Sequence, residues 1–438
     1  MKVLKFGGTS VGSPQRMKEV SQLINDGDKK IVVLSAMSGT TNSLVEISDY
    51  LYKKNPEGAN EVINKLERKY IQHVYDLYNT DEYKQKTLTF IKDIFNGIRS
   101  FTKDIFTLFE EKVILSQGEL ISTNMVTNYL LEQGVNVVLL PALEFMRTDK
   151  NAEPDLVYIK NKLTAQLEMH PDADLYITQG YICRNAYGEV DNLQRGGSDY
   201  SASLIGAAVN ASEIQIWTDI DGMHDNDPRI VEKTSPVRQL HFEEAAELAY
   251  FGAKILHPTC IQPAKYANIP VRLLNTMEPS APGTLISNDT ELGKIKAVAA
   301  KDNITAIQIK SGRMLLAYGF LRKVFEIFES YQTSIDMICT SEVGVSVSID
   351  NTKHLNEILT DLKKYGTVHV DHDMCIICVV GDLRWENVGF EAKALDAMRE
   401  IPVRMISFGG SDYNISFLVS KDDKNRALQS LSDHLFNH

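Results

Sequence analysis

Two glycine-rich turns, each beside a cation, contain the residues best suited to chemistry. The first turn is residues 5–10, Lys-Phe-Gly-Gly-Thr-Ser, in which a lysine ends an apolar segment and two glycines and two hydroxyls follow. Backbone N–H groups can approach an oxygen-rich ligand closely at Gly7 and Gly8, and the helix that follows favours negative charge. Because Lys5 precedes the glycines, the segment is not a Walker A loop. It predicts a phosphate site, although a tight turn without a ligand would have the same residues.

The second turn is residues 195–199, Arg-Gly-Gly-Ser-Asp. The guanidinium of Arg195 matches the two oxygens of a planar carboxylate. The helix predicted over Tyr200–Val209 has Asp199 in its first turn, where a carboxylate would also stabilise a helix that binds no ligand. Coincidence is a poor explanation for two such turns in one chain, so together they predict a site for an anionic ligand.

Two later segments add charged groups. Residues 217–222, Trp-Thr-Asp-Ile-Asp-Gly, are typical of a strand that ends in a polar loop, and Arg229 follows. A polar turn without a ligand is the alternative. Residues 251–258, Phe-Gly-Ala-Lys-Ile-Leu-His-Pro, place Lys254 near the end of a helix, where a lone lysine is usually solvated. Neither segment predicts a site by itself.

The elements that must position these residues alternate between short apolar strands and helices. Strands that are apolar on both faces and separated by helices indicate a mostly parallel sheet covered by helices. A long stretch with helical periodicity and few glycines or prolines, about residues 43–131, indicates a helical insertion after the second strand. The predicted strands are Val3–Phe6, Ile31–Ser35, Asn136–Leu140, Leu175–Thr178 and Glu213–Thr218.

The last third of the chain contains an internal repeat. Residues 341–347 resemble residues 411–417, and Gly319-Phe320 resembles Gly389-Phe390, at the same offset of seventy residues. Each copy has the pattern of a ferredoxin-like βαββαβ unit. A turn-rich connector at residues 278–284 precedes the repeat. We therefore expect a first domain over residues 1–290 and two small modules over 301–370 and 371–438.

Composition excludes several classes of protein. The 438 residues carry a net charge of −12 and no long basic block, which argues against a nucleic-acid or anionic-membrane surface. No segment has the roughly 18–20 apolar residues needed to span a bilayer. The five cysteines do not form a disulfide framework, and we expect a cytoplasmic protein. Cys375 and Cys378 lie on one predicted strand with their side chains on opposite faces, so they predict no metal or redox site.

Taken together, the segments resemble the aspartate kinases of the amino-acid kinase superfamily over essentially the whole chain. The four segments above, Gly118-Glu119 and Asp227-Pro228-Arg229 occur in the order and approximate spacing of that family. The doubled module resembles its paired ACT regulatory domains, and the monofunctional, lysine-inhibited form is the most similar. The resemblance implies an α/β/α sandwich with a mostly parallel sheet, followed by tandem ferredoxin-like ACT modules.

The resemblance also implies an activity, which is transfer of the γ-phosphoryl group of ATP to the side-chain carboxylate of L-aspartate. The product, 4-phospho-L-aspartate, begins lysine, threonine and methionine biosynthesis. Such a transfer needs positioning and charge neutralisation more than covalent chemistry. Mg²⁺ would arrive with ATP, and we expect no protein-bound metal. The ACT-like modules imply a homodimer or a larger oligomer, since pairing their sheet edges between chains satisfies backbone groups.

Residue roles follow from the same resemblance. Lys5 would stabilise the moving phosphoryl group, Lys254 would neutralise the nucleotide phosphates and Asp199 would orient the catalytic lysine. Arg195 would bind the α-carboxylate of aspartate, and Glu119 would bind its ammonium group. The full sets are catalytic Lys5, Asp199 and Lys254; substrate-binding Thr41, Glu119, Arg195, Gly196, Gly197 and Ser198; ATP-binding Lys5, Gly7, Gly8, Thr218, Asp219, Arg229 and Lys254; and effector-binding Met314, Gly319, Phe320, Leu321, Ser334, Ile335 and Asp336. His224 replaces a tyrosine common in relatives and is left out.

L-Lysine is the effector that the resemblance implies. Gly319 would open a helix whose N–H groups bind the effector's carboxylate, and Asp336 would pair with an ammonium group. The alternative is that Asp336 only begins a strand and that Met314 belongs to the core. Two other functions stay open: another amino-acid kinase of this fold, and a non-catalytic amino-acid sensor. A sensor would be expected to lose Lys5, Asp199 or Lys254, and all three are present.

Overall fold

The computed structural model describes residues 1–103, 105–193, 196–252, 257–289, 291–312 and 318–436. Arg195, Lys254 and Met314 lie outside the described residues. The chain forms two compact units, and each is described by itself: Met1–Met223 with Ile255–Asn288, and His224–Lys254 with Asp289–His438. Among the described residues, no helix has the length and apolar character to span a membrane.

The first unit is built on a sheet that contains the strands β12-β11-β7-β1-β2-β4-β3 in this order, in which all pairs are parallel except β11 with β12. The prediction of a mostly parallel sheet is confirmed. The elements of this unit are β1 (Lys2–Phe6), α1 (Pro14–Ile24), β2 (Lys30–Leu34), α2 (Thr40–Tyr52), α3 (Pro56–Leu77), α4 (Asp81–Ser100), η1 (Phe101–Lys103), α5 (Leu108–Glu132), β3 (Val137–Leu140), η2 (Ala142–Glu144), α6 (Leu156–Glu168), β4 (Leu175–Gln179), β5 (Ile182–Arg184), β6 (Val190–Asn192), α7 (Gly197–Ala208), β7 (Ile214–Thr218), η3 (Pro258–Ile261), α9 (Gln262–Tyr266), β11 (Val271–Asn275) and β12 (Thr284–Ser287).

Strand β1 lies at the centre of this sheet, between β2 and β7. All five residues of β2 and of β4 are buried, as expected for strands covered on both faces. The chain continues from β1 to β2 on one side and pairs with β7 on the other, so the strand order reverses here. In such sheets, ligands bind outside the carboxyl ends of the strands at this reversal. Lys5 and Thr218 lie at those ends.

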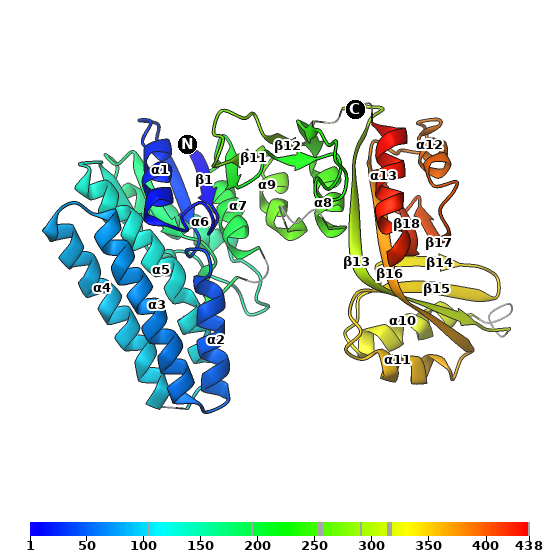
Figure 1. The fold of residues 1–438 in the computed structure, drawn as a ribbon, viewed down its shortest axis with the longest axis horizontal. Helices are drawn as coiled ribbons and strands as arrows, with labels where there is room; N and C mark the ends of the chain where they lie inside the picture. Colours follow the sequence, from blue (N-terminus) through cyan, green and yellow to red (C-terminus); the bar gives the residue numbers. More distant parts are fainter. Residues whose placement is uncertain (104, 194–195, 253–256, 290, 313–317, 437–438) are drawn as a thin grey trace. The chain divides into compact units, whose positions relative to one another are not determined.

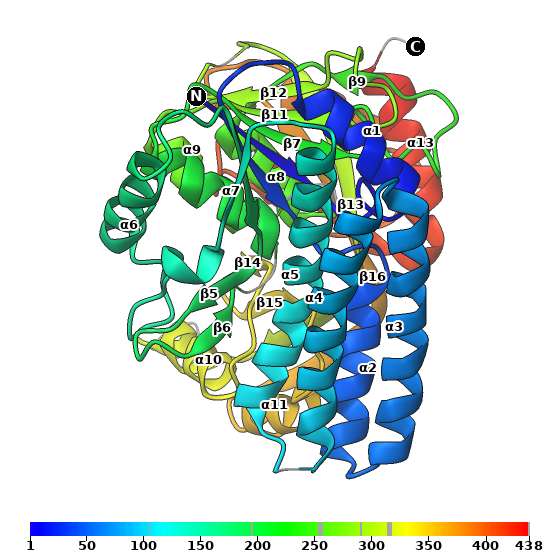
Figure 2. The ribbon, with the colours of Figure 1, turned by 90° about the vertical axis from the view of Figure 1, so that its left-hand side faces the viewer.

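Helices α2, α3, α4 and α5 pack together as a bundle (Figure 1 and Figure 2). Their shared core contains the fully buried aromatic side chains of Tyr70 and Phe95. Side-chain caps fix where two of these helices begin: Asn55 caps α3, and Thr107 forms a reciprocal capping box with Glu110 at the start of α5. The bundle holds the N-terminus of α2 and the middle of α5 next to the sheet.

The second unit has a six-stranded antiparallel sheet in the order β14-β15-β13-β16-β18-β17 (Figure 1). Helices α10 and α12 both begin after a glycine in the left-handed region, with φ of 82° at Gly319 and 95° at Gly389, as the repeat predicts. From residue 223 onward the further elements are β8 (Met223–His224), β9 (Pro236–Val237), β10 (Gln239–His241), α8 (Phe242–Tyr250), β13 (Ile295–Lys310), α10 (Phe320–Ser330), β14 (Met337–Thr340), β15 (Gly344–Ile349), α11 (Leu355–Leu362), β16 (Thr367–Gly381), α12 (Phe390–Ala397), β17 (Val403–Phe408), β18 (Asn414–Ser420), η5 (Lys421–Asp423) and α13 (Lys424–Leu435).

The two modules share two long strands. Residues 304–310 of β13 pair with residues 367–374 of β16, whereas residues 295–301 of β13 pair with residues 376–381. The first segment completes the sheet of the first module, and the second completes the sheet of the second. The second module therefore takes a strand that precedes the first module in the chain. The seventy-residue repeat does not reveal this exchange, because it depends on pairing between distant segments.

Candidate active site

A buried ion pair joins the two glycine-rich turns. Nζ of Lys5, near the end of β1, lies 2.7 Å from Oδ1 of Asp199, in the first turn of α7. Their side chains are 11% and 14% exposed. A Cβ added at Gly7 would lie 3.4 Å from Nζ of Lys5, so the glycine leaves open space beside the ammonium group. The placement of Asp199 in a first helical turn is confirmed, and its partner is the predicted catalytic lysine.

Helix α7 begins at Gly197, three residues earlier than the predicted Tyr200. Gly196 precedes it with φ of 75°, a conformation that favours glycine. A Cβ on Gly196 would lie 2.3 Å from Sγ of Cys260, and one on Gly197 would lie 2.5 Å from the ring of Tyr181. Periodicity of apolar residues cannot detect a helical turn made of glycine and serine, which explains the difference. The N–H groups of Gly197 and Ser198 in the first turn have no acceptor within the helix, and Gly196 has no side chain that could cap them.

Glu119 is a buried carboxyl group with one unused oxygen. It lies on α5, is 4% exposed, and its Oε1 accepts a 3.2 Å hydrogen bond from the N–H of Ala36. Among the described residues, Oε2 has no hydrogen-bond partner. Burial raises the pKa of Glu119 to about 8. Glu119 therefore has no positive partner within the described part of the chain, and a ligand's ammonium group would supply one.

Thr41 lies exposed at the N-terminus of α2, which follows Gly39 in the left-handed region. The neighbouring Thr40 is fully buried and its hydroxyl lies 2.7 Å from the hydroxyl of Tyr70. Tyr70 belongs to α3 of the helical bundle, and it fixes the turn from which Thr41 projects. Sequence analysis missed Tyr70, because no motif surrounds it and only the folded bundle brings it to this turn.

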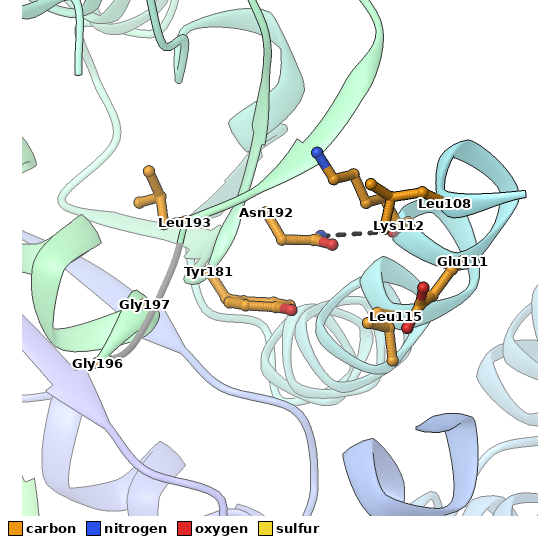
Figure 3. A pocket seen from close by; sticks show the side chains of 9 residues that line it. All are labelled: Leu108, Glu111, Lys112, Leu115, Tyr181, Asn192, Leu193, Gly196 and Gly197. Atoms are coloured by element: carbon orange, nitrogen blue, oxygen red, sulfur yellow. Dashed lines mark hydrogen bonds between the residues drawn. The ribbon is translucent and has the colours of Figure 1, made fainter. Parts of the chain in front are cut away.

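A cavity of about 380 Å³ opens between α5 and the turn that precedes α7 (Figure 3). Tyr181 lies on one side of it with φ of 68°, an uncommon conformation for a residue with a side chain. Asn192 lies beside Tyr181 and donates a hydrogen bond to the carbonyl of Lys112 on α5. Sequence analysis missed both residues, although the cavity includes two glycines of the predicted substrate site. The lining residues are Leu108, Glu111, Lys112, Leu115, Tyr181, Asn192, Leu193, Gly196 and Gly197.

The predicted nucleotide residues divide between the two units. Thr218 ends β7 and Asp219 follows it. The N–H of Gly7 donates to the carbonyl of Trp217, so this end of β7 adjoins the first glycine turn. Arg229 belongs to the second unit, where its guanidinium bonds both oxygens of Asp227 at 2.9 and 2.7 Å. Its side chain is 76% exposed. Thr218 and Asp219 therefore lie together in the first unit, whereas Arg229 belongs to the second.

The described effector residues also belong to the second unit. Gly319 precedes α10, as predicted, with Phe320 buried and Leu321 exposed after it. Ser334, Ile335 and Asp336 lead into β14. Asp336 already has protein partners, Lys301 and Tyr250, which sequence analysis did not anticipate. No signal links these three positions along the chain.

Comparison with known proteins identifies the family. The model of the amino acid kinase family matches residues 1–275, and an ACT domain model matches residues 377–435. The lysine-sensitive aspartokinase 3 of Escherichia coli is 32% identical over 99% of both chains.

Among the described residues, no group of three or more histidine, cysteine, aspartate or glutamate side chains could hold a metal ion.

Solved structures agree with this result. A structure of E. coli aspartokinase III with aspartate and ADP, described as the R-state, has a TM-score of 0.86 and 31% identity, with both chains covered completely. A structure of the same enzyme with lysine and aspartate, described as the T-state, has a TM-score of 0.82 and 32% identity, again with both chains fully covered. The chain described here belongs to the amino acid kinase family and, within it, to the aspartokinases.

Proposed function

We propose that the chain phosphorylates the side-chain carboxylate of L-aspartate with ATP, and that Lys5 is the cation that stabilises the moving phosphoryl group. The observation that carries this proposal is the Lys5–Asp199 pair at the strand-order reversal, between two glycine-rich turns. Asp199 fixes the position of the ammonium group before substrate binds, so little reorganisation is needed in the transition state. The substrate carboxylate is ionised at pH 7, so the reaction needs no general base.

The substrates are L-aspartate and ATP, which brings Mg²⁺ as its complex. Gly7 and Gly8 let the backbone approach the phosphates, and Thr218 and Asp219 lie at the adjoining end of β7. Lys254 and Arg229 complete the nucleotide site in this proposal. The protein's part is therefore to position two anionic substrates and to neutralise the charge between them.

Selectivity for an α-amino acid rests on Glu119. Its unused Oε2 is a buried acceptor, and an ammonium group is the donor that compensates best for its charge. Arg195 binds the α-carboxylate in this proposal, while Thr41 and the start of α7 contact the substrate's remaining oxygens. Another amino-acid kinase of the same fold would need a different partner at Glu119 if its substrate lacked a free amino group.

Regulation by L-lysine is the second part of the proposal. The E. coli structure with lysine and aspartate supports it, as does the ACT domain match. We assign catalysis to residues 1–290 and regulation to the two modules that follow. None of the five cysteines forms a disulfide among the described residues, and we propose that the protein works in the reducing cytoplasm.

We further propose that the modules pair between chains, giving a homodimer or a larger oligomer. An unpaired sheet edge is the usual reason for such pairing. Static light scattering of the full chain, with and without amino acids, is expected to give at least twice the 49.2 kDa of one chain. A single-chain mass at all micromolar concentrations would contradict the proposal.

The activity is tested by measuring ADP release from ATP with acidic and neutral amino acids, while hydroxylamine traps any acyl phosphate. We expect release and trapping with L-aspartate and neither with N-acetyl-L-aspartate, which lacks the ammonium group. Preference for a different amino acid would make the chain another amino-acid kinase. No release with any of them would make it an amino-acid sensor.

A further inference from the structure

The loop that carries Arg229 is part of the second unit. Residues 225–235 connect β8 with β9, and Arg229 lies near the middle of this loop. Its guanidinium binds Asp227 through Nε and Nη2, which leaves further N–H groups of the same guanidinium for a ligand. A side chain that is 76% exposed loses conformational freedom when it binds a ligand, so its affinity depends on how firmly the loop holds it beforehand.

A buried amide joins this loop to α13, the last helix of the second module. Asn226 is 3% exposed, and its Nδ2 donates a 3.0 Å hydrogen bond to the carbonyl of Leu428. The same side chain accepts a 2.8 Å hydrogen bond at Oδ1 from the N–H of Asp227. One side chain therefore connects the helix to the residue that holds the guanidinium of Arg229.

The packing between the loop and α13 is incomplete. Val231 is 1% exposed and belongs to the same hydrophobic core as Leu428 and Leu431 of the helix. Beside this contact lies a cavity of about 550 Å³, which is lined by residues 230–233 and by the second half of α13. Because the cavity leaves part of the two segments without mutual contacts, the hydrogen bond of Asn226 has a larger share in holding the loop.

The start of α13 and strand β13 also hold the loop. The hydrogen bond with Arg229 lowers the pKa of Asp227, and the charge of Lys424, the first residue of α13, lowers it further. Asp227 therefore stays ionised at neutral pH, as its two bonds to Arg229 require. The N–H of Val298 in β13 donates a 2.8 Å hydrogen bond to the carbonyl of Asp225. These contacts fix the loop within the second unit.

We propose that Asn226 is a positioning residue for ATP, because it fixes the Asp227–Arg229 pair on α13 and so makes the last helix of the second module part of the support for nucleotide binding. The inference rests on the nucleotide role proposed above for Arg229. It adds a contribution from a helix that lies beyond residues 1–290. Asn226 acts through Arg229 and does not itself contact the nucleotide.

Asn226→Asp tests this role in the full-length protein. The change keeps the size of the side chain and the oxygen that accepts from Asp227, but it removes the donor to Leu428. We expect the KM for ATP to rise on the order of fivefold, with kcat and the KM for aspartate within about twofold of wild type. Asn226→Ala, which adds no charge, should change the KM for ATP in the same direction. An unchanged KM for ATP in folded variants, or an equal rise for both substrates, would overturn the proposal.

A matched control lies on the same helix. The hydroxyl of Ser430 donates a 2.7 Å hydrogen bond to the carbonyl of Ala397 in α12. Ser430→Ala therefore removes another bond between a side chain and a carbonyl that holds α13, without touching the Arg229 loop. We expect a lower thermal midpoint but a KM for ATP within about twofold of wild type. A rise equal to that of Asn226→Asp would show that loosening the second module is the cause, and the role of Asn226 would be wrong.

The double variant with Arg229→Ala separates this inference from the proposal on which it rests. If Asn226 acts through Arg229, adding Asn226→Asp to Arg229→Ala should change the KM for ATP less than about twofold. The full fivefold effect in that background would overturn the inference. If Arg229→Ala alone leaves ATP binding unchanged, the nucleotide role of Arg229 fails together with this inference. If Arg229→Ala weakens ATP binding but the Asn226 variants do not, only this inference fails.

Discussion

Two buried lysine–aspartate pairs have the same chemistry in different surroundings. Nζ of Lys5 lies 2.7 Å from Asp199 in the first unit, and Nζ of Lys301 lies 2.7 Å from Asp336 in the second. Among the described residues, Asp199 is the one carboxylate within 4 Å of Lys5. Lys301 has a second carboxylate and an aromatic ring as further partners.

These surroundings decide whether the lysine or the aspartate of each pair is left to bind a ligand. An ammonium group has three donors, so Lys5 keeps donors for an anionic ligand after it has bound Asp199. Lys301 has its donors engaged, and the unused group of its pair is an oxygen of Asp336. The first pair therefore presents a cation to phosphate, and the second presents an anion to ammonium. Equal distances within two ion pairs do not imply equal roles.

The largest effect is expected from removing the cation of the first pair. Lys5→Met keeps an unbranched side chain, one atom shorter, but removes its charge, and we expect turnover to fall on the order of a hundredfold or more. Steady-state ADP release measures the loss, and circular dichroism checks the fold. Lys364→Met, which breaks the exposed pair of Lys364 with Asp361, serves as a lysine control. If the folded Lys5→Met variant turns over as fast as wild type, Lys5 is not the cation that stabilises the phosphoryl group, and the proposed difference between the two pairs is wrong.

Glu119 sharpens the comparison, because it is a buried carboxyl group that forms no ion pair with any described residue. Aspartate's ammonium group favours the ionised form, whereas the free enzyme holds the proton up to a pKa of about 8. Binding should therefore release a proton. The affinity for aspartate should rise with pH by up to about tenfold per unit below pH 8 and level off above it.

The Glu119→Gln variant isolates this group. It should raise the KM for aspartate roughly 30-fold, because a buried charge pair is lost, and abolish the pH dependence below pH 8. Titration calorimetry in buffers of different ionisation enthalpy would count the released proton. A wild-type protein whose aspartate affinity stays constant between pH 6 and 8 would contradict the role given to Glu119.

The smallest of the three effects concerns the second pair. Asp336→Ala removes the anion presented to the effector, and we expect the lysine concentration for half-inhibition to rise at least about tenfold, within the range of typical coupling energies. Assays at subsaturating aspartate with lysine, threonine or methionine measure it. Thermal stabilisation by lysine should be lost in parallel. Inhibition that persists at wild-type lysine concentrations, or that responds to threonine alone, would assign the effector site elsewhere.

Local features of this protein follow from its sequence because their causes are local. The apolar runs of β1 and β2 predict buried parallel strands. The repeated Gly319-Phe320 and Gly389-Phe390 pairs predict two helix starts, and the left-handed backbone found at both glycines is one that glycine adopts readily. The order of the glycine turns and their neighbouring charges predicts the family. Each of these inferences uses residues close together in the chain.

Tertiary structure alone decided the features that depend on distant segments. Residues 295–301 complete the sheet of the second module, Tyr70 supports Thr40, and Lys301 meets Asp336. The unused oxygen of Glu119 depends on the burial of α5 against β2, which no motif records. Pairing, burial and charge balance are properties of contacts across the fold, and a lysine or glutamate in the sequence has no defined partner until those contacts form.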